Sequence, residues 1–179
     1  MTQLALVIVR YNSTDPAARR LHVREAMATC RWAVGQGYAP VCSLLHLADV
    51  NDPPEDTAGE VRDRVMEYSQ ALARMVGAAG GVAIVPGWYE MTSGMSEDKS
   101  EFYQFHPQRI NGGFQMFYRP TFAKIEPYMP RDLVGQVQAA CVLIESRQYL
   151  TPDVAMAKAY RAALGDIDDE TGITPSEVQ

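Results

Sequence analysis

Aromatic, hydroxyl and carboxyl side chains follow one apolar run within a single stretch of this chain. Val82–Val85 reads as a buried strand, Gly87 and Trp88 belong to a tight turn, and Ser93-Gly94 precedes a group of acids. Hydroxyls and carboxylates can bind polar ligands or move protons, and an exposed indole can stack on a nucleobase. Because ligands of α/β proteins bind just beyond the carboxyl ends of parallel strands, we expect a site at this junction.

The acids of this junction are Glu97, Asp98 and Glu101. Acids in the first turn of a helix can simply complement the helix dipole, and this interpretation stays open for all of them. Asp98 differs from the others because it follows Met95 by three residues and precedes Phe102 by four, inside an apolar stripe. Burying an unpaired carboxylate is costly, so we expect Asp98 to face a ligand.

Side chains from other strand ends are expected in the same crevice. Arg10, Tyr11 and Asn12 follow the first expected strand, and His46 follows the second. Arg10 can pair with a phosphate or carboxylate, and His46 is a possible proton carrier. Either residue can equally be an ordinary surface side chain. Trp88 either holds a base or closes the end of the core, and the sequence leaves both alternatives open.

These residues depend on an alternation of strands and helices along the chain. Apolar periodicity and turn residues predict strands at 4–9, 38–45, 82–85 and 114–119, and helices at 16–35, 61–76, 95–106, 132–147 and 152–164. The first helix is expected to bury Val23, Met27, Cys30 and Val34. This order predicts a flavodoxin- or Rossmann-like α/β sandwich of three layers, with a mostly parallel sheet of four or five strands and additional C-terminal helices.

The chain is expected to form one α/β domain over residues 1–125. A helical extension is expected to follow over 126–165. The tail, 166–179, is acidic and poor in large apolar side chains, so we expect it to be disordered.

Composition limits the classes of function. The 179 residues are 47% hydrophobic and 21% charged with a net charge of −6, as in an ordinary soluble domain. The basic residues are scattered, which argues against binding to duplex nucleic acid but not against a single nucleotide. The sequence has no run long enough to span a membrane and no leader pattern, so we expect a cytoplasmic protein.

Metal and cofactor motifs are missing from the sequence. Cys30, Cys42 and Cys141 are widely spaced and the histidines have no ligand spacing, so we expect free buried thiols and no metal. The sequence also lacks G-x-G-x-x-G, a P-loop and a nucleophile-elbow serine. We therefore expect no cofactor.

The strand–turn–helix junction resembles the nucleoside 2-deoxyribosyltransferase-like superfamily, which includes nucleotide N-glycosidases and small phage and bacterial domains. The matching features are Val82–Val85, Pro86-Gly87-Trp88, Ser93-Gly94 and a carboxylate, Asp98, four residues after that glycine. The run Cys30–Pro40 is similar to the family's step from the first helix into the second strand. The resemblance covers roughly residues 4–119.

This resemblance implies that the protein cleaves or exchanges the N-glycosidic bond of a nucleoside or nucleoside 5′-monophosphate. In such enzymes a carboxylate attacks the anomeric carbon or stabilises its positive charge. Asp98 would be that carboxylate, and Trp88 would hold the base. Arg10 or the Ser93-Gly94 backbone would lie near the sugar or phosphate.

The resemblance also implies a proton donor and an assembly. Tyr11 or His46 would protonate the leaving base. The active protein would be a homo-oligomer, because such sites are commonly completed by a neighbouring subunit. The aromatic stretch Phe114–Tyr128 would supply interface surface.

The chain departs from the family pattern at three places. Asp98 replaces a Glu, Gly80-Gly81 replaces an acid, and Arg10-Tyr11 replaces a Gly-Pro step. Glu97 or Glu101 would take the catalytic role if the helix began in another register. The alternative function is therefore a non-catalytic nucleotide-binding module, a sensor or a sequestering protein, with the same crevice. A purely structural protein would bind no nucleotide at all.

Overall fold

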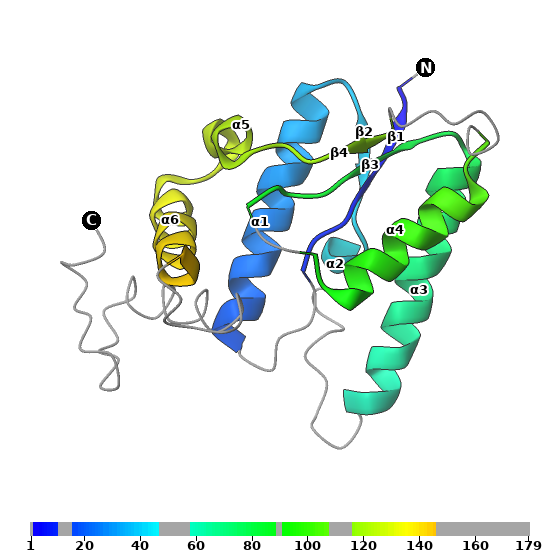
Figure 1. Ribbon diagram of the computed structural model, residues 1–179, viewed down its shortest axis with the longest axis horizontal. Coiled ribbons are helices and arrows are strands. Elements are labelled where there is room, and N and C mark those ends of the chain that lie inside the picture. Colours follow the sequence, from blue (N-terminus) through cyan, green and yellow to red (C-terminus); the bar gives the residue numbers. More distant parts are fainter. Residues whose placement is uncertain (1, 11–15, 47–57, 89–90, 108–115, 146–179) are drawn as a thin grey trace.

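The computed structural model describes residues 2–10, 16–46, 58–88, 91–107 and 116–145. Its elements, in chain order, are β1 (Leu4–Val7), α1 (Pro16–Gly35), β2 (Ala39–Val41), α2 (Ser43–His46), α3 (Ala58–Ala78), β3 (Val82–Ile84), α4 (Ser93–Phe105), β4 (Phe117–Tyr118), α5 (Phe122–Ile125), η3 (Glu126–Tyr128) and α6 (Arg131–Glu145). Figure 1 shows the strands between α1 and the pair formed by α3 and α4.

The sheet has four strands in the order β2-β1-β3-β4, and every neighbouring pair is parallel. β1 is central, with Leu4 beside Ala39 of β2 and Ala5 beside Val82 of β3. The predicted α/β class with a parallel sheet is confirmed. After β1, the chain adds β2 on one side of β1 and then β3 on the opposite side of β1. The direction in which strands are added to the sheet therefore reverses between β1 and β3.

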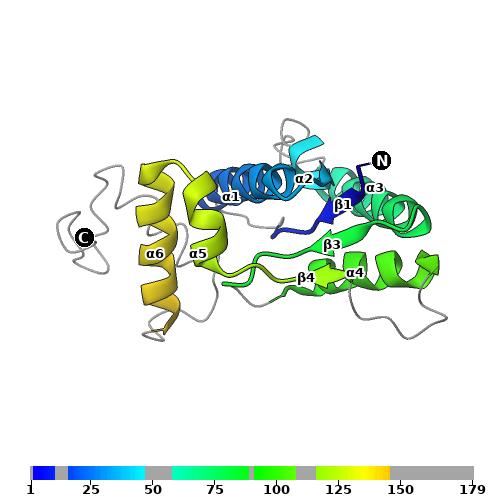
Figure 2. The same cartoon turned by 90° about the horizontal axis from the view of Figure 1, so that it is seen from above.

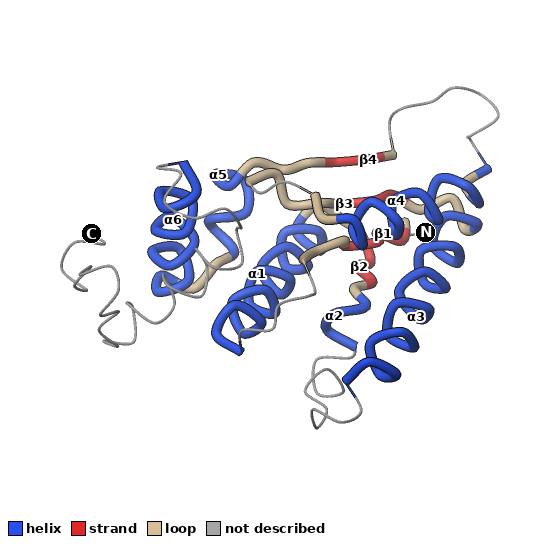
Figure 3. The backbone as a smooth tube through the Cα atoms, turned by 60° about the horizontal axis from the view of Figure 1, so that its bottom comes forward, coloured by secondary structure: helices blue, strands red, loops and turns tan. Residues whose placement is uncertain are grey.

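Helices cover both faces of the sheet and make three layers (Figure 3). Side chains of β1 alternate between two cores, as the period of a strand requires. Ala5 and Val7 pack in the core beneath α1, which we call the α1-side core. Leu6 and Ile8 pack in the core beneath α3 and α4, which we call the α3-side core.

The buried face of α1 agrees with the predicted one only in part. Val23 and Cys30 are half-buried and pack against the α1-side core, but Met27 is 41% exposed and Val34 is 61% exposed. Leu21, Glu25 and Trp32 are buried, at spacings that share one face of the helix. Apolar periodicity misplaces part of this face because a buried position of α1 carries a glutamate.

The second strand is shorter than predicted, and a helical turn replaces its end. β2 ends at Val41, and Ser43–His46 forms α2, so the strand expected over 38–45 is wrong in its second half. Pro40 lies in β2, which is an edge strand where a missing amide donor is tolerated. The apolar pair Leu44-Leu45 belongs to this turn, and periodicity cannot separate a short helix from a short strand.

The α3–α4 pair has the most extensive contact between helices. Gly77 allows this approach, because a Cβ atom there would overlap the carbonyl oxygen of Phe102. Gly80 then ends the turn after α3 with a positive φ of 70°, which favours glycine. The contact at Gly77 therefore lets α3 and α4 pack closely against each other.

The C-terminal elements pack beside α1, away from α3 (Figure 2). Arg24 of α1 donates to Asp132 and to Gln136 of α6, and Leu133 and Val137 enter the α1-side core. The expected helix at 152–164 and the acidic tail lie outside the described residues. The proposed division at residue 125 stays a prediction. No helix in the described ranges has the length and apolar character needed to cross a membrane.

Candidate functional site

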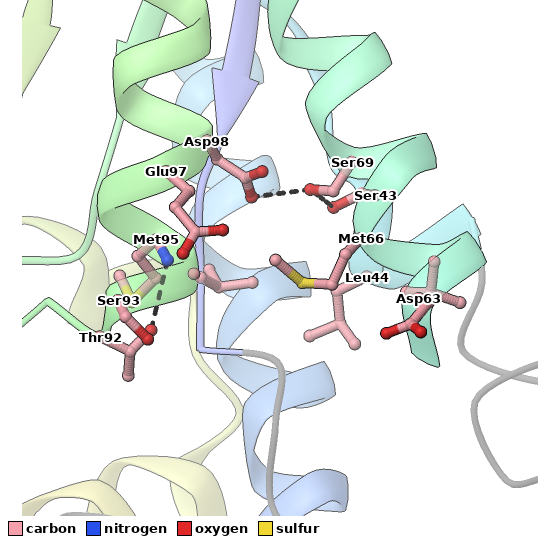
Figure 4. Close-up of a pocket in the computed structure, with 13 residues that line it drawn as sticks. Ser43, Leu44, Asp63, Met66, Ser69, Thr92, Ser93, Met95, Glu97 and Asp98 are labelled. Atoms are coloured by element: carbon pink, nitrogen blue, oxygen red, sulfur yellow. Dashed lines mark hydrogen bonds between the residues drawn. The ribbon is translucent and has the colours of Figure 1, made fainter. Parts of the chain in front are cut away.

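A cavity of about 570 Å³ lies at the carboxyl edge of the sheet, between α3 and α4. We call it the α3–α4 pocket. Its lining comes from the segments after β1 and β2, from α3 and from the first turns of α4: Val9, Ser43, Leu44, Asp63, Val65, Met66, Ser69, Thr92, Ser93, Gly94, Met95, Glu97 and Asp98. Figure 4 shows the two helices facing each other across it. Ligand sites of open parallel sheets are expected where the strand order reverses, and this pocket adjoins that point.

The first turn of α4 forms one wall of the pocket. Thr92 is its N-cap, and the Thr92 hydroxyl accepts a hydrogen bond from the Met95 amide at 3.3 Å. The helix begins at Ser93, so its first turn carries no acid. Glu97 and Asp98 lie one turn further on, where the field of the helix terminus is weaker. Complementing the helix dipole is therefore a poor explanation for these acids.

Asp98 is the end of a chain of hydrogen bonds that joins three elements. Its Oδ2 accepts from the Ser69 hydroxyl of α3 at 2.7 Å. Ser69 Oγ and Ser43 Oγ of α2 are 2.9 Å apart, and either can be the donor. Figure 4 shows the three side chains pointing toward one another at one end of the pocket.

The Asp98 carboxyl group is held with incomplete hydrogen bonding. Oδ1 is buried and has no hydrogen-bond partner among the described residues. Burial raises the pKa of Asp98 to about 6, the Ser69 hydrogen bond opposes this rise, and the charges of Glu97 and Glu101 add to it. A carboxyl group with this pKa changes its charge near neutral pH, which is the range that acid–base and nucleophilic chemistry uses.

The other lining residues suit a small ligand with hydroxyl groups. Exposed carboxylates of Asp63 and Glu97 lie on opposite helices, and Ser93 adds a hydroxyl at the α4 end. Met66 projects between the helices, and its terminal methyl group lies within contact distance of the place where Gly94 lacks a side chain. The pocket thus combines acceptors for hydroxyl donors with an apolar wall.

The structure brings one group of predicted site residues together in the pocket, namely Ser93, Gly94, Glu97 and Asp98. Glu101 is not among the lining residues. Its Oε2 accepts from Arg74 Nε of α3 at 2.6 Å, outside the pocket. The predicted catalytic role of Glu101 therefore loses its structural basis.

Trp88 faces the other side of the sheet. Its indole Nε1 donates to Glu25 Oε1 of α1 at 2.9 Å, and the ring meets Phe122 edge to face at 5.8 Å between centroids. Gly87 continues the pairing with the segment after β4, donating its amide to the Pro120 oxygen at 3.0 Å, and has no room for a Cβ atom. Neither Trp88 nor Gly87 lines the pocket, and the core-closing alternative for Trp88 describes its position.

The remaining predicted residues lie around the pocket or outside the described residues. His46 is exposed, and its Nδ1 lies 3.1 Å from the Tyr68 hydroxyl, so it does not reach the lining. Arg10 is half-buried after β1 and is also absent from the lining. Tyr11 and Asn12 lie outside the described residues, and their predicted roles stay predictions.

Ser69 and Ser43 were missed by the sequence-based search for the site. Ser69 is only 7% exposed, and it lies on the same face of α3 as Val65 and Val76, which are also buried. A polar residue within an apolar stripe is the signal that identified Asp98, and it was present at Ser69 too. Ser43 carried no comparable signal, because its helical turn was predicted as strand.

The cysteines are free thiols, of which Cys42 is buried and Cys30 and Cys141 are half-buried. The thiols of Cys30 and Cys42 interact, which raises the pKa of Cys30. Within the described ranges, histidine, cysteine and acidic side chains do not gather in groups of three that could hold a metal ion.

Comparisons of the chain with protein-family models, with curated proteins and with solved structures find no match. Function is therefore inferred from the pocket and from the sequence resemblance, which stays a prediction.

Proposed function

We propose that the protein binds a nucleoside or nucleoside 5′-monophosphate in the α3–α4 pocket and cleaves or exchanges its N-glycosidic bond. The observation that carries this proposal is Asp98. A carboxyl group with a pKa of about 6 lines a ligand-sized cavity and is bonded to a serine through one oxygen only. Small-molecule sites typically have volumes of roughly 300 to 1,000 Å³, and this cavity falls in that range.

The chemistry follows from the charge of Asp98. In the reaction, the C–N bond breaks, the base leaves with the electron pair, and positive charge develops on the anomeric carbon and ring oxygen. An ionised carboxylate stabilises that charge or forms an ester with the anomeric carbon. Water then completes hydrolysis, or a second base completes exchange. The departing base takes up a proton from solvent or from a side chain.

Ser69 supports this role. Its hydroxyl donates to Oδ2 and favours the ionised form of Asp98, which counteracts part of the effect of burial. Ser43 in turn lies within hydrogen-bond distance of Ser69 and orients its hydroxyl. The carboxylate is thereby held in one position, so the entropy of orienting it is lost on folding and not on ligand binding.

A second candidate is a nucleotide-binding module without catalysis. The observation that favours it is the restricted access to the Asp98 carboxylate: Oδ2 accepts a hydrogen bond from Ser69, and Oδ1 is buried. A nucleophile must reach the anomeric carbon, and Asp98 would have to rotate to do so. A binding protein needs no such movement.

The test is release of free base from a panel of nucleosides and their 5′-monophosphates, measured by chromatography. We expect release from at least one compound by the wild-type protein, and a loss of at least about a hundredfold in Asp98→Asn. The matched control is Glu101→Gln, on the same helix but outside the pocket, which should retain activity.

Thermal shift with the same panel separates the two candidates. Stabilisation by a ligand without base release supports the binding module, because a ligand that binds only the folded state raises the melting temperature. Equal release by wild type and Asp98→Asn contradicts the catalytic role. Absence of both release and stabilisation with every compound contradicts both candidates.

A further inference from the structure

We propose that the α3–α4 pocket selects the neutral nucleoside and rejects its 5′-monophosphate, with Asp63 and Glu97 as the specificity-determining residues. This inference rests on the proposed function, which leaves the phosphorylation state of the substrate open. It assigns to two exposed acids a role other than catalysis.

The charge of the lining is the first observation. Asp63, Glu97 and Asp98 line the pocket, and the described lining contains neither lysine nor arginine. A phosphate group in this cavity would meet carboxylates on both helices (Figure 4). Like charges close together disfavour each other, most strongly where water is partly excluded.

The residues next to the lining in sequence include arginines. Arg10 follows Val9, and Arg62 and Arg64 flank Asp63. Neither Arg10 nor Arg64 is among the lining residues, so the charge of the described lining itself is negative.

Two cations of the pocket helices interact with other side chains. Arg74 pairs with Glu101, and the Lys99 ammonium lies 4.2 Å from the centre of the Phe117 ring. Neither Arg74 nor Lys99 is among the lining residues. An anionic ligand would thus gain no ion pair from α3 or α4 through these side chains.

Among the described residues of the lining, the N-terminus of α4 is a feature that favours an anion. Its effect is reduced here, because the Thr92 hydroxyl already accepts the Met95 amide. Glu97 and Asp98 follow one turn later and place negative charge beside the same end of the helix. The balance of these charges opposes a phosphate with a charge between about −1.5 and −2 at neutral pH.

A neutral sugar fits the same lining. The Ser93 hydroxyl can donate or accept, and the carboxylates of Asp63 and Glu97 accept from ribose hydroxyls. Hydrogen bonds to a charged acceptor are stronger than neutral ones, so acids favour a ligand that brings hydroxyl donors.

The experiment measures dissociation constants by calorimetry for matched pairs: adenosine, cytidine, guanosine and thymidine, each against its 5′-monophosphate. At low salt the wild-type protein should bind its preferred nucleoside at least about tenfold more tightly than the matching monophosphate. The combined variant Asp63→Asn with Glu97→Gln should reduce this ratio about tenfold. The control Glu67→Gln, an exposed acid of α3 outside the lining, should leave the ratio unchanged.

Salt provides a readout that needs no variant. Since added salt screens repulsion between charges, the wild-type ratio should fall as sodium chloride rises from 20 to about 300 mM. Equal or tighter binding of a monophosphate at low salt overturns this inference while the proposed function stands. A ratio that does not respond to salt or to the double variant also overturns it. Absence of binding by all eight compounds overturns both the inference and the proposed function.

Discussion

At the scale of single residues, Asp98 combines burial with charge. Its carboxyl group lies between α4 and Ser69, and one of its oxygens is buried without a hydrogen bond among the described residues. A buried acceptor that lacks a partner costs roughly 1 to 3 kcal/mol. Such a group contributes nothing to stability, which is in keeping with the role that we propose for Asp98.

The first prediction concerns stability and pH. Burial raises the pKa of folded Asp98 from 3.8 to about 6, so the folded state holds a proton that the unfolded state has lost between these values. The contribution of Asp98 to the free energy of unfolding therefore falls as pH rises from about 4 to 6. At pH 8, Asp98→Asn should be more stable than wild type by about 1 to 3 kcal/mol, with a smaller difference at pH 4.

Urea unfolding at both pH values measures this difference. Glu97→Gln, an exposed neighbour, should change stability by less than about 0.5 kcal/mol. If Asp98→Asn were equally destabilising at pH 4 and pH 8, the carboxylate would not be penalised by burial.

The second prediction concerns the hydrogen bond from Ser69. This bond lowers the pKa of Asp98, so Ser69→Ala should move that pKa above its wild-type value of about 6. Any activity that needs the carboxylate should then be lost at a higher pH on the acidic side of its profile. Ser43→Ala, which removes a partner of Ser69 but not of Asp98, should cause a smaller shift. A profile unchanged by Ser69→Ala would show that another group controls the acidic limb.

At the scale of elements, the pocket depends on the spacing of α3 and α4. Gly77 lies against the backbone of Phe102 near one end of this pair, and Ser69 meets Asp98 further along it. Because both helices are rigid, a change of their spacing at the Gly77 contact would also change the distance between the two walls of the pocket.

The third prediction tests this contact. Gly77→Ala should lower the free energy of unfolding by about 1 to 3 kcal/mol, since the new methyl group overlaps the carbonyl oxygen of Phe102. Gly135→Ala in α6 is the matched control, because nothing lies within 4 Å of its added Cβ atom. That control should be neutral or stabilising by up to about 1 kcal/mol. Chemical denaturation of both variants provides the measurement, and equal effects would contradict the close contact.

Long periodic segments were predictable from sequence, and short or polar ones were not. The helices α1, α3 and α4 and the strands β1 and β3 follow apolar patterns that local residues determine. The short turn α2 was predicted as strand because an apolar pair fits either structure.

Within the site, the helical pattern identified Asp98. The position of Trp88 could not be derived, because it follows the pairing of Gly87 with Pro120, which depends on the segment after β4, far away in sequence. Local periodicity carries no information about such a contact.

At the scale of the whole molecule, the carboxyl edge of the sheet has two polar groups on opposite faces. The α3–α4 pocket with Asp98 lies on one face. The hydrogen-bonded pair of Trp88 and Glu25 lies on the other, in contact with α1 and the α1-side core. The sequence suggested one crevice that combined Asp98 with Trp88, and the sheet separates them.

The most direct measurement is therefore the position of a bound nucleoside in crystals soaked at saturating concentration. We predict ligand density between α3 and α4, with sugar hydroxyls within hydrogen-bond distance of Asp98 and Ser93 and the base against Met66. Density beside Trp88 and Glu25 on the α1 face, or an empty α3–α4 pocket in crystals of a protein that binds the nucleoside in solution, would contradict the account.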